Sequence, residues 1–225
     1  ANYDFSNTPK LNFTNQIPEF VRRYSLSKIT GVGNIPSNKE IQTIIEAAGH
    51  SVKGLLVDVS NYSLYFYGQP VHIFDAKKVN WDIQIRFAKV WEKILALDDR
   101  EYELGEKDIV IADSEKVLAI AWIIWGKSSA VSEETTEILV ETAHFDQAIL
   151  RMTWKRLWVR TDALNVFEKD ILPEMCSRSQ ALVIRELQNV FPTLKVEAFA
   201  DSYSQKQEKV IQDFDGDYLK ATQLN

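Results

Sequence analysis

The feature that most constrains the fold is a run of nine consecutive apolar residues, 117–125, which reads VLAIAWIIW. At helical spacing such a run leaves no face for water, so neighbouring elements must enclose it on every side. It is less than half as long as the roughly 20 residues that a helix needs to cross a bilayer. The run therefore predicts a buried helix in the centre of a globular core, with Gly126 at its end.

The composition is typical of a soluble globular protein, since 45% of the 225 residues are hydrophobic and 26% are charged. The formal net charge of −6 disfavours a protein dedicated to nucleic acid, although a local basic groove can coexist with an acidic total. Cys176 is the only cysteine, which excludes an intrachain disulfide, and no Cys/His cluster indicates a zinc site. The first twenty residues lack the apolar region of a secretion signal, so we expect a cytoplasmic protein that does not contact membranes.

Hydrophobic periodicity predicts a mostly helical chain. A capping box at 37–40 and the apolar stripe after it predict a helix that Gly49 ends. Residues 80–97 carry apolar side chains on one helical face, and residues 132–160 have acids at the start and cations at the end, which suits a helix dipole. Residues 52–75 have period two and predict a small antiparallel β-meander. The predicted fold class is α+β and predominantly α-helical, with a single helical core, this meander and two extended terminal arms.

Polar stretches without periodicity flank the core. We divide the chain into an N-terminal arm of residues 1–17, a mostly helical core of residues 18–200 and a C-terminal arm of residues 201–225. The last long helix of the core is predicted over 177–191, closed by Pro192. Polar termini are ordered only when something ties them down, and arms exchanged between subunits are one way to do so. The arms therefore predict a homo-oligomer.

No motif indicates catalysis, a metal or a cofactor. Residues 121–128 match a permissive phosphate-loop pattern, but the loop positions hold two Trp and two Ile, which favour burial over wrapping a phosphate. His50, His72 and His144 are too far apart in the sequence to form a local metal-binding motif. We therefore predict no catalytic residue, no metal ligand and no cofactor.

One stretch favours a binding function. Residues 151–160 read RMTWKRLWVR and hold four cations, two Trp and no acid in an otherwise acidic protein. Arg and Lys can neutralise phosphates, and Trp can stack on unpaired bases. The alternative is that both Trp are core residues and the cations serve the helix dipole or pair with acids. The predicted nucleic-acid-binding residues are Arg151, Lys155, Arg156, Arg160, Trp154 and Trp158.

These observations lead to the hypothesis of a non-enzymatic, self-assembling structural protein that packages or binds nucleic acid, comparable to a viral nucleocapsid or coat subunit. Its partners would be copies of itself, joined through the arms, and a single-stranded nucleic acid. Its location would then be the cytoplasm of an infected host cell. The absence of a catalytic motif, the two polar arms and the Arg/Trp stretch motivate this hypothesis.

Two alternatives belong to other functional classes. The first is a protein–protein interaction module or adaptor, whose contact surface would be Tyr62, Tyr65 and Tyr67 of the meander, because Tyr is enriched at interfaces. The second is a carboxylate-based hydrolase or nuclease. Its site would be assembled in space from distant residues of the meander, namely Asp58, His72 and Asp75.

Overall fold

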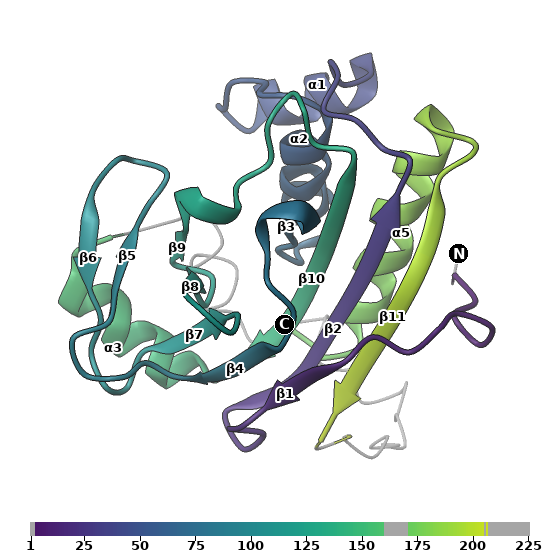
Figure 1. The fold of residues 1–225 in the computed structure, drawn as a ribbon. Coiled ribbons are helices and arrows are strands. Elements are labelled where there is room, and N and C mark those ends of the chain that lie inside the picture. Colours follow the sequence, from purple (N-terminus) through teal and green to yellow (C-terminus); the bar gives the residue numbers. More distant parts are fainter. Residues whose placement is uncertain (1–2, 160–170, 205, 207–225) are drawn as a thin grey trace, which may run out of the picture.

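The protein consists of two β-sheets packed face to face, with helices covering the outer face of one sheet (Figure 1). The structure is a computed structural model, and it describes residues 3–159, 171–204 and 206. Most of the described strands are short, and most pairings between them are antiparallel.

The four-stranded sheet has the order β11-β2-β10-β3 and is antiparallel throughout. The long strand β10 lies between β2 and β3, so that Glu141 is opposite Leu26 on one side and opposite His72 on the other. On its other side β3 has only an isolated bridge between Phe74 and Ala130. The strands are β2 (Val21–Thr30), β3 (His72–Asp75), β10 (Glu137–Phe145) and β11 (Lys195–Tyr203).

The five-stranded sheet has the order β1-β4-β7-β8-β9, and only its β1–β4 pairing is parallel. A separate hairpin, β5–β6, extends beside it (Figure 1). The strands are β1 (Phe13–Asn15), β4 (Ile83–Phe87), β5 (Lys93–Leu95), β6 (Glu101–Glu103), β7 (Ile109–Ala112), β8 (Val117–Ile120) and β9 (Ile124–Trp125).

The helices gather in two places. Helices α2 and α5 cover the four-stranded sheet, α1 packs on α2 and the π-helix, and α3 lies beside the β5–β6 hairpin (Figure 1). A π-helical segment continues α2 directly. The helical elements are α1 (Lys39–Ala47), α2 (Leu55–Tyr62), the π-helix η1 (Ser63–Tyr67), the 3-10 turns η2 (Ala76–Lys78) and η3 (Lys127–Ser129), α3 (Gln147–Leu157) and α5 (Met175–Val190).

The four-stranded sheet is buried on both faces. On one face Tyr24, Leu139 and Phe145 join the cluster between the two sheets. On the other face Ile138 and Val140 join the cluster under the helices. The side chains of β10 therefore find apolar surroundings whichever way they point, since successive residues of a strand alternate between faces.

The prediction of a predominantly α-helical fold is wrong. Strand β10 lies within residues 132–160, which were predicted as a helix, and residues 52–75 form α2, the π-helix and β3 instead of a meander. The cause for β10 is its burial on both faces, which removes the alternation that marks a strand. The helix predicted over 177–191 is confirmed as α5, whose C-cap is Phe191.

Two further helices are replaced by strands. Residues 80–97 form β4, a turn and β5, and Trp91 in that turn has a φ of 69°, which no right-handed helix contains. The apolar run 117–125 forms β8 and β9, and Trp122 between them has a φ of 54°. Most of the run is buried as expected, but the apolar enclosure comes from the space between the sheets, not from other helices.

The N-terminal segment lies along the protein's own sheets. The backbone N–H of Leu11 donates to the carbonyl of Phe199 at 3.0 Å, and Phe199 N–H donates to the carbonyl of Pro9 at 2.9 Å. The chain then continues into β1 of the other sheet, so these residues connect the two sheets within one chain. Of the predicted C-terminal arm, 201–203 belong to β11, and most of the remainder lies outside the described residues.

We expect Gly126→Ala to destabilise the protein by about 1–3 kcal/mol, because an added Cβ would lie 2.5 Å from the carbonyl oxygen of Leu118 and must displace β8 or β9. Gly33→Ala is the matched control, since its nearest neighbour would be a Phe191 ring atom at 3.7 Å. Urea unfolding measures both. Equal stability of the two variants would contradict the close approach at Gly126.

Candidate functional site

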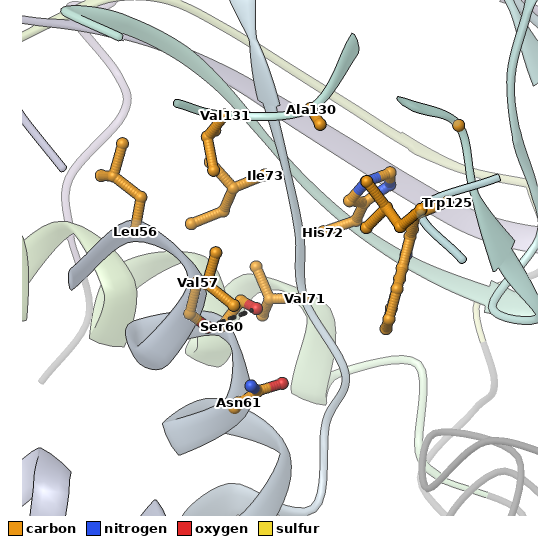
Figure 2. A pocket seen from close by; sticks show the side chains of 12 residues that line it. Leu56, Val57, Ser60, Asn61, Val71, His72, Ile73, Trp125, Ala130 and Val131 are labelled. Carbon is orange, nitrogen blue, oxygen red and sulfur yellow. Dashed lines mark hydrogen bonds between the residues drawn. The ribbon is translucent and has the colours of Figure 1, made fainter. Parts of the chain in front are cut away.

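A pocket of about 170 Å³ lies at the exposed edge of the four-stranded sheet, between α2 and the loops that flank β9 (Figure 2). Its lining is mostly apolar with a few polar groups, which is typical of small-molecule sites. The lining residues are Leu56, Val57, Ser60, Asn61, Val71, His72, Ile73, Leu97, Trp125, Gly126, Ala130 and Val131.

Helix α2, strand β3 and the segment 125–131 at the end of β9 form most of the walls. Helix α2 contributes one face, with Ser60 one turn after Leu56. Strand β3 supplies the middle wall, and Figure 2 shows Ile73 on the α2 side of this strand and His72 on the side of Trp125. The pocket therefore extends across the edge of β3, where little pairs with the strand's outer side.

The lining residue His72 forms a buried pair with Glu141, which lies opposite it on β10 and is not itself a lining residue. The distance from His72 Nδ1 to Glu141 Oε2 is 3.4 Å, and the two side chains are 12% and 2% exposed. This contact lacks hydrogen-bond geometry, and Glu141 Oε2 has no hydrogen-bond partner among the described residues. The hydroxyl of Tyr24, on strand β2, is also buried and has no hydrogen-bond partner among the described residues.

Burial decides the protonation state of this pair. Removal from water raises the pKa of Glu141 to about 8 and lowers the pKa of His72 to about 3. Burial also raises the pKa of Tyr24, with the charge of Glu141 as a second cause. Near pH 7 the site therefore holds a neutral carboxylic acid and a neutral imidazole. A protonated carboxyl can both donate and accept a hydrogen bond.

Aromatic rings hold His72 in place. Its ring lies 3.8 Å from that of Phe74 and 5.6 Å from that of Trp125, measured between centroids. Nδ1 is directed at Glu141, so Nε2 is the ring nitrogen left for a ligand. Among the described residues of the lining, Ser60 and Asn61 on the α2 wall and the indole N–H of Trp125 are the polar side-chain groups besides His72, and the Ser60 hydroxyl donates to the carbonyl of Val57 at 3.0 Å.

Sequence reasoning missed Glu141, although a signal was present. Residues 138–145 of strand β10 are all buried, and Glu141 is the one acid among them. A carboxyl is almost never fully buried without a partner, so an acid within an apolar strand indicates a functional position. The run was interpreted as a helix, which made this acid a surface residue.

The structure separates the residues of the predicted nucleic-acid site. Arg151, Lys155 and Trp158 are exposed on α3 or at its C-cap. Arg156 turns back to pair with Asp108. Trp154 is partly buried against the core, and Arg160 lies outside the described residues.

The carboxylate site of the hydrolase alternative does not form. Asp58 is buried and accepts hydrogen bonds from Ser37 Oγ at 2.6 Å and from two backbone N–H groups at the start of α2. Asp75 is bound by Thr135 Oγ1 at 2.8 Å. His72 contacts neither of them and pairs with Glu141. Among the residues that the structure describes, no three His, Cys, Asp or Glu side chains converge on a metal position.

The tyrosines of the adaptor alternative also differ from expectation. Tyr62 is only 4% exposed, and Tyr65 and Tyr67 pack partly against the core. Cys176 is buried, and burial raises the pKa of its thiol to about 12, so it is inert as a nucleophile. The described ranges contain no helix with the length and apolar character that spanning a membrane requires.

Comparison with known proteins gives a consistent result. The sequence model of the B3/4 domain matches residues 21–192. The phenylalanine–tRNA ligase beta subunit of Brucella abortus (strain 2308) is 39% identical over 156 residues, which are 69% of this chain and 19% of that protein. The same subunit of Carboxydothermus hydrogenoformans is 39% identical over 176 residues, which are 76% of this chain and 22% of that protein. The chain spans about a fifth of the length of these relatives.

A solved structure is also similar. It is an N-terminal fragment of the phenylalanyl-tRNA synthetase beta subunit from Pyrococcus horikoshii, at a TM-score of 0.44 and 16% identity, over 70% of this chain and 51% of that chain. The sequence matches contradict the hypothesis of a self-assembling viral coat or nucleocapsid protein, because the relatives are subunits of an aminoacyl-tRNA ligase. The same matches contradict the alternatives of an interaction adaptor and of a carboxylate-based hydrolase or nuclease.

The protonation of Glu141 predicts how stability depends on pH. A carboxyl whose pKa is raised on folding from 4.5 to about 8 stabilises the folded state at low pH and loses this contribution as the pH rises through that window. His72, lowered on folding from 6.5 to about 3, opposes this trend only below pH 6.5. Stability should therefore fall between pH 6.5 and 8 by about 1.4 kcal/mol per pH unit or less.

Glu141→Gln should abolish this slope, because the amide does not titrate. Glu137→Gln, a change on the same strand at a side chain that is 33% exposed, is the control and should retain the slope. Urea unfolding at half-unit pH steps measures all three proteins. A slope that survives Glu141→Gln would show that another group causes it.

Proposed function

The chain belongs to the B3/4 domain family, and we propose that its pocket receives the aminoacyl end of a tRNA and that the protein removes a wrongly attached amino acid by hydrolysis. Its relatives are phenylalanine–tRNA ligase beta subunits, of which it covers about a fifth, so ligation itself is not carried over. Such a protein acts where aminoacylated tRNA is used, and we therefore propose a cytoplasmic location.

The selectivity problem of a phenylalanine ligase indicates the amino acid. Tyrosine differs from phenylalanine by one hydroxyl, and a hydrophobic pocket rejects an analogue that merely adds a hydroxyl only about 100-fold. A second site that hydrolyses the wrong product corrects such errors. That second site must prefer the amino acid with the hydroxyl. A buried polar group of the site that pairs with the hydroxyl is left unpaired when phenylalanine binds, and this weakens the binding of phenylalanine.

The observation that carries this proposal is the buried pair of His72 and Glu141, of which His72 lines the apolar pocket and Glu141 lies next to it on β10. The apolar walls suit an aromatic ring, and the neutral carboxyl of Glu141 with His72 can pair with a phenol hydroxyl. A charged carboxylate at this depth would accept hydrogen bonds only. The proposed substrate is thus a tyrosyl ester of a tRNA that accepts phenylalanine.

The reaction is ester hydrolysis. Water adds to the ester carbonyl, the bond from the carbonyl carbon to the ribose oxygen breaks, and that oxygen takes a proton to become the terminal ribose hydroxyl. The amino acid leaves as its carboxylate, and the remaining proton goes to solvent. Ser60 and Asn61 supply polar atoms on the wall opposite His72, where they can orient the ester and the water.

We expect the protein to deacylate Tyr-tRNA of the phenylalanine acceptor at least 10-fold faster than Phe-tRNA of the same acceptor. Glu141→Met should reduce this preference to near unity, because the thioether cannot pair with the hydroxyl. Glu141→Gln should retain much of it near pH 7, since a neutral amide also donates and accepts. Release of radiolabelled amino acid at 37 °C measures the rates.

Glu137→Met is the matched control, because Glu137 lies on the same strand and pairs with Lys28 away from the pocket lining. It should leave both rates unchanged. Equal hydrolysis of the two esters by the unaltered protein, or none of either, would overturn the proposal. A preference that persists in Glu141→Met would remove Glu141 from it.

A further inference from the structure

We propose that the exposed face of α3 binds RNA, with Arg151 and Lys155 on phosphates and Trp158 stacked on an unpaired base. The identification of this RNA as tRNA rests on the proposed function, whereas the surface itself is argued from its own geometry. We call these three residues the α3 surface.

The α3 surface lies at the C-terminal half of the helix and its end. Arg151 and Lys155 are at positions i and i+4 and share one side of α3, and Trp158 is the C-cap residue that follows its last turn. All three are exposed, and Trp158 is 91% exposed. The face runs from Ala148, also exposed, to the C-terminal end of the helix.

The α3 surface is cationic in an acidic protein. None of the eleven residues of α3 is acidic, and the N-cap Asp146 lies at the opposite end from Trp158. The formal net charge of the whole chain is −6, so an acid-free helix face is a local feature. Cations grouped on one face attract phosphates and release their counterions.

The structural alternative accounts for only part of the cluster. Arg156 pairs with Asp108, and Nη1 of the same side chain donates to the carbonyl of Glu103 at 3.1 Å. Trp154 packs on the core. Cations in the last turn also complement the helix dipole. Ion pairing, core packing and the helix dipole do not account for Trp158, because its indole is exposed and carries no charge.

Trp158 is also unusual in its backbone. It ends α3 with φ 54° and ψ 30°, a left-handed conformation in which glycine is normally found and a bulky residue is an outlier. An indole that is fully exposed at a position suited to glycine stabilises neither the fold nor the helix end. Stacking on a base gives the ring a contact worth about 1–3 kcal/mol.

The α3 surface is connected to the pocket through the β5–β6 hairpin. Arg156 binds this hairpin at Glu103, and the chain that leaves β5 reaches the pocket lining at Leu97. Figure 1 shows the hairpin beside α3, with β9 next to β5. An RNA whose aminoacylated end enters the pocket therefore has a cationic helix within the same half of the molecule.

The test uses fluorescently labelled, uncharged tRNA and the full chain. Fluorescence anisotropy measures the affinity at salt concentrations from about 50 to about 300 mM, where the strength of phosphate contacts changes steeply. Arg151→Gln and Lys155→Gln should each weaken binding and reduce the slope of log K against log salt by about 1. Trp158→Gly should weaken binding about 10-fold without changing this slope.

Two controls separate stacking from folding. Trp91→Gly removes an indole of the same kind, 85% exposed and with a φ of 69°, from a turn next to Glu92, and it should leave the affinity unchanged. Lys39→Gln removes an exposed cation from α1 and should also be neutral. Since glycine favours the left-handed backbone, neither tryptophan variant should lower the midpoint of urea unfolding.

Equal loss of affinity in Trp158→Gly and Trp91→Gly, or no loss in any α3 variant, would overturn the inference. The latter result would assign the α3 surface to another class of partner, such as a protein. Deacylation distinguishes this failure from that of the proposed function. If the α3 variants hydrolyse Tyr-tRNA at the rate of the unaltered protein, only the role of the α3 surface is rejected. If tRNA binding depends on α3 but no hydrolysis occurs, only the proposed function is rejected.

Discussion

The burial of the four-stranded sheet on both faces is the constraint on which the rest of the structure depends. Strand β10 lies inside this sheet and contributes Leu139 to the core between the sheets and Val140 to the core under the helices. Helix α5 packs on this strand and its neighbour β2, and side chains of the second sheet share the core on their other face. A short edge strand, β3, can then remain partly unpaired at one side, where the pocket forms.

The same burial gives the site its chemistry. A carboxyl on an exposed strand would be charged near pH 7 and would accept hydrogen bonds only. Glu141 lies on a strand enclosed by apolar layers, so desolvation keeps it neutral, and it faces His72 because β10 and β3 pair in register. Burying His72 and Glu141 without a hydrogen bond between them lowers the stability of the fold. This loss occurs beside the apolar pocket, where a polar group is needed to select a ligand hydroxyl.

The sequence predicted the elements whose signals are local. The apolar stripes of helices α1 and α5 were interpreted correctly, although the N-cap of α1 is Asn38 and not Ser37, whose hydroxyl donates to Asp58. The pattern of strand β10 was interpreted as helical, because burial on both faces removes the polar–apolar alternation of a strand and leaves a run compatible with a helix or a strand. The turn at Trp91 was missed because no local rule predicts a tryptophan with positive φ. The pairing of His72 with Glu141 depends on register across 69 residues, which periodicity does not contain.

In the functions proposed for them, the pocket and the α3 surface use electrostatics in opposite ways, and this follows from where the fold places them. In the pocket, low exposure makes the cost of an unpaired polar group large, so selectivity arises from one hydroxyl and is insensitive to salt. On α3, Arg151 and Lys155 remain solvated, so each contact is weak, additive and screened by salt. Recognition of a chemical difference of one atom requires the first environment, and holding a long polyanion without reading its sequence requires the second. An acidic chain can contain both, because net charge describes neither environment.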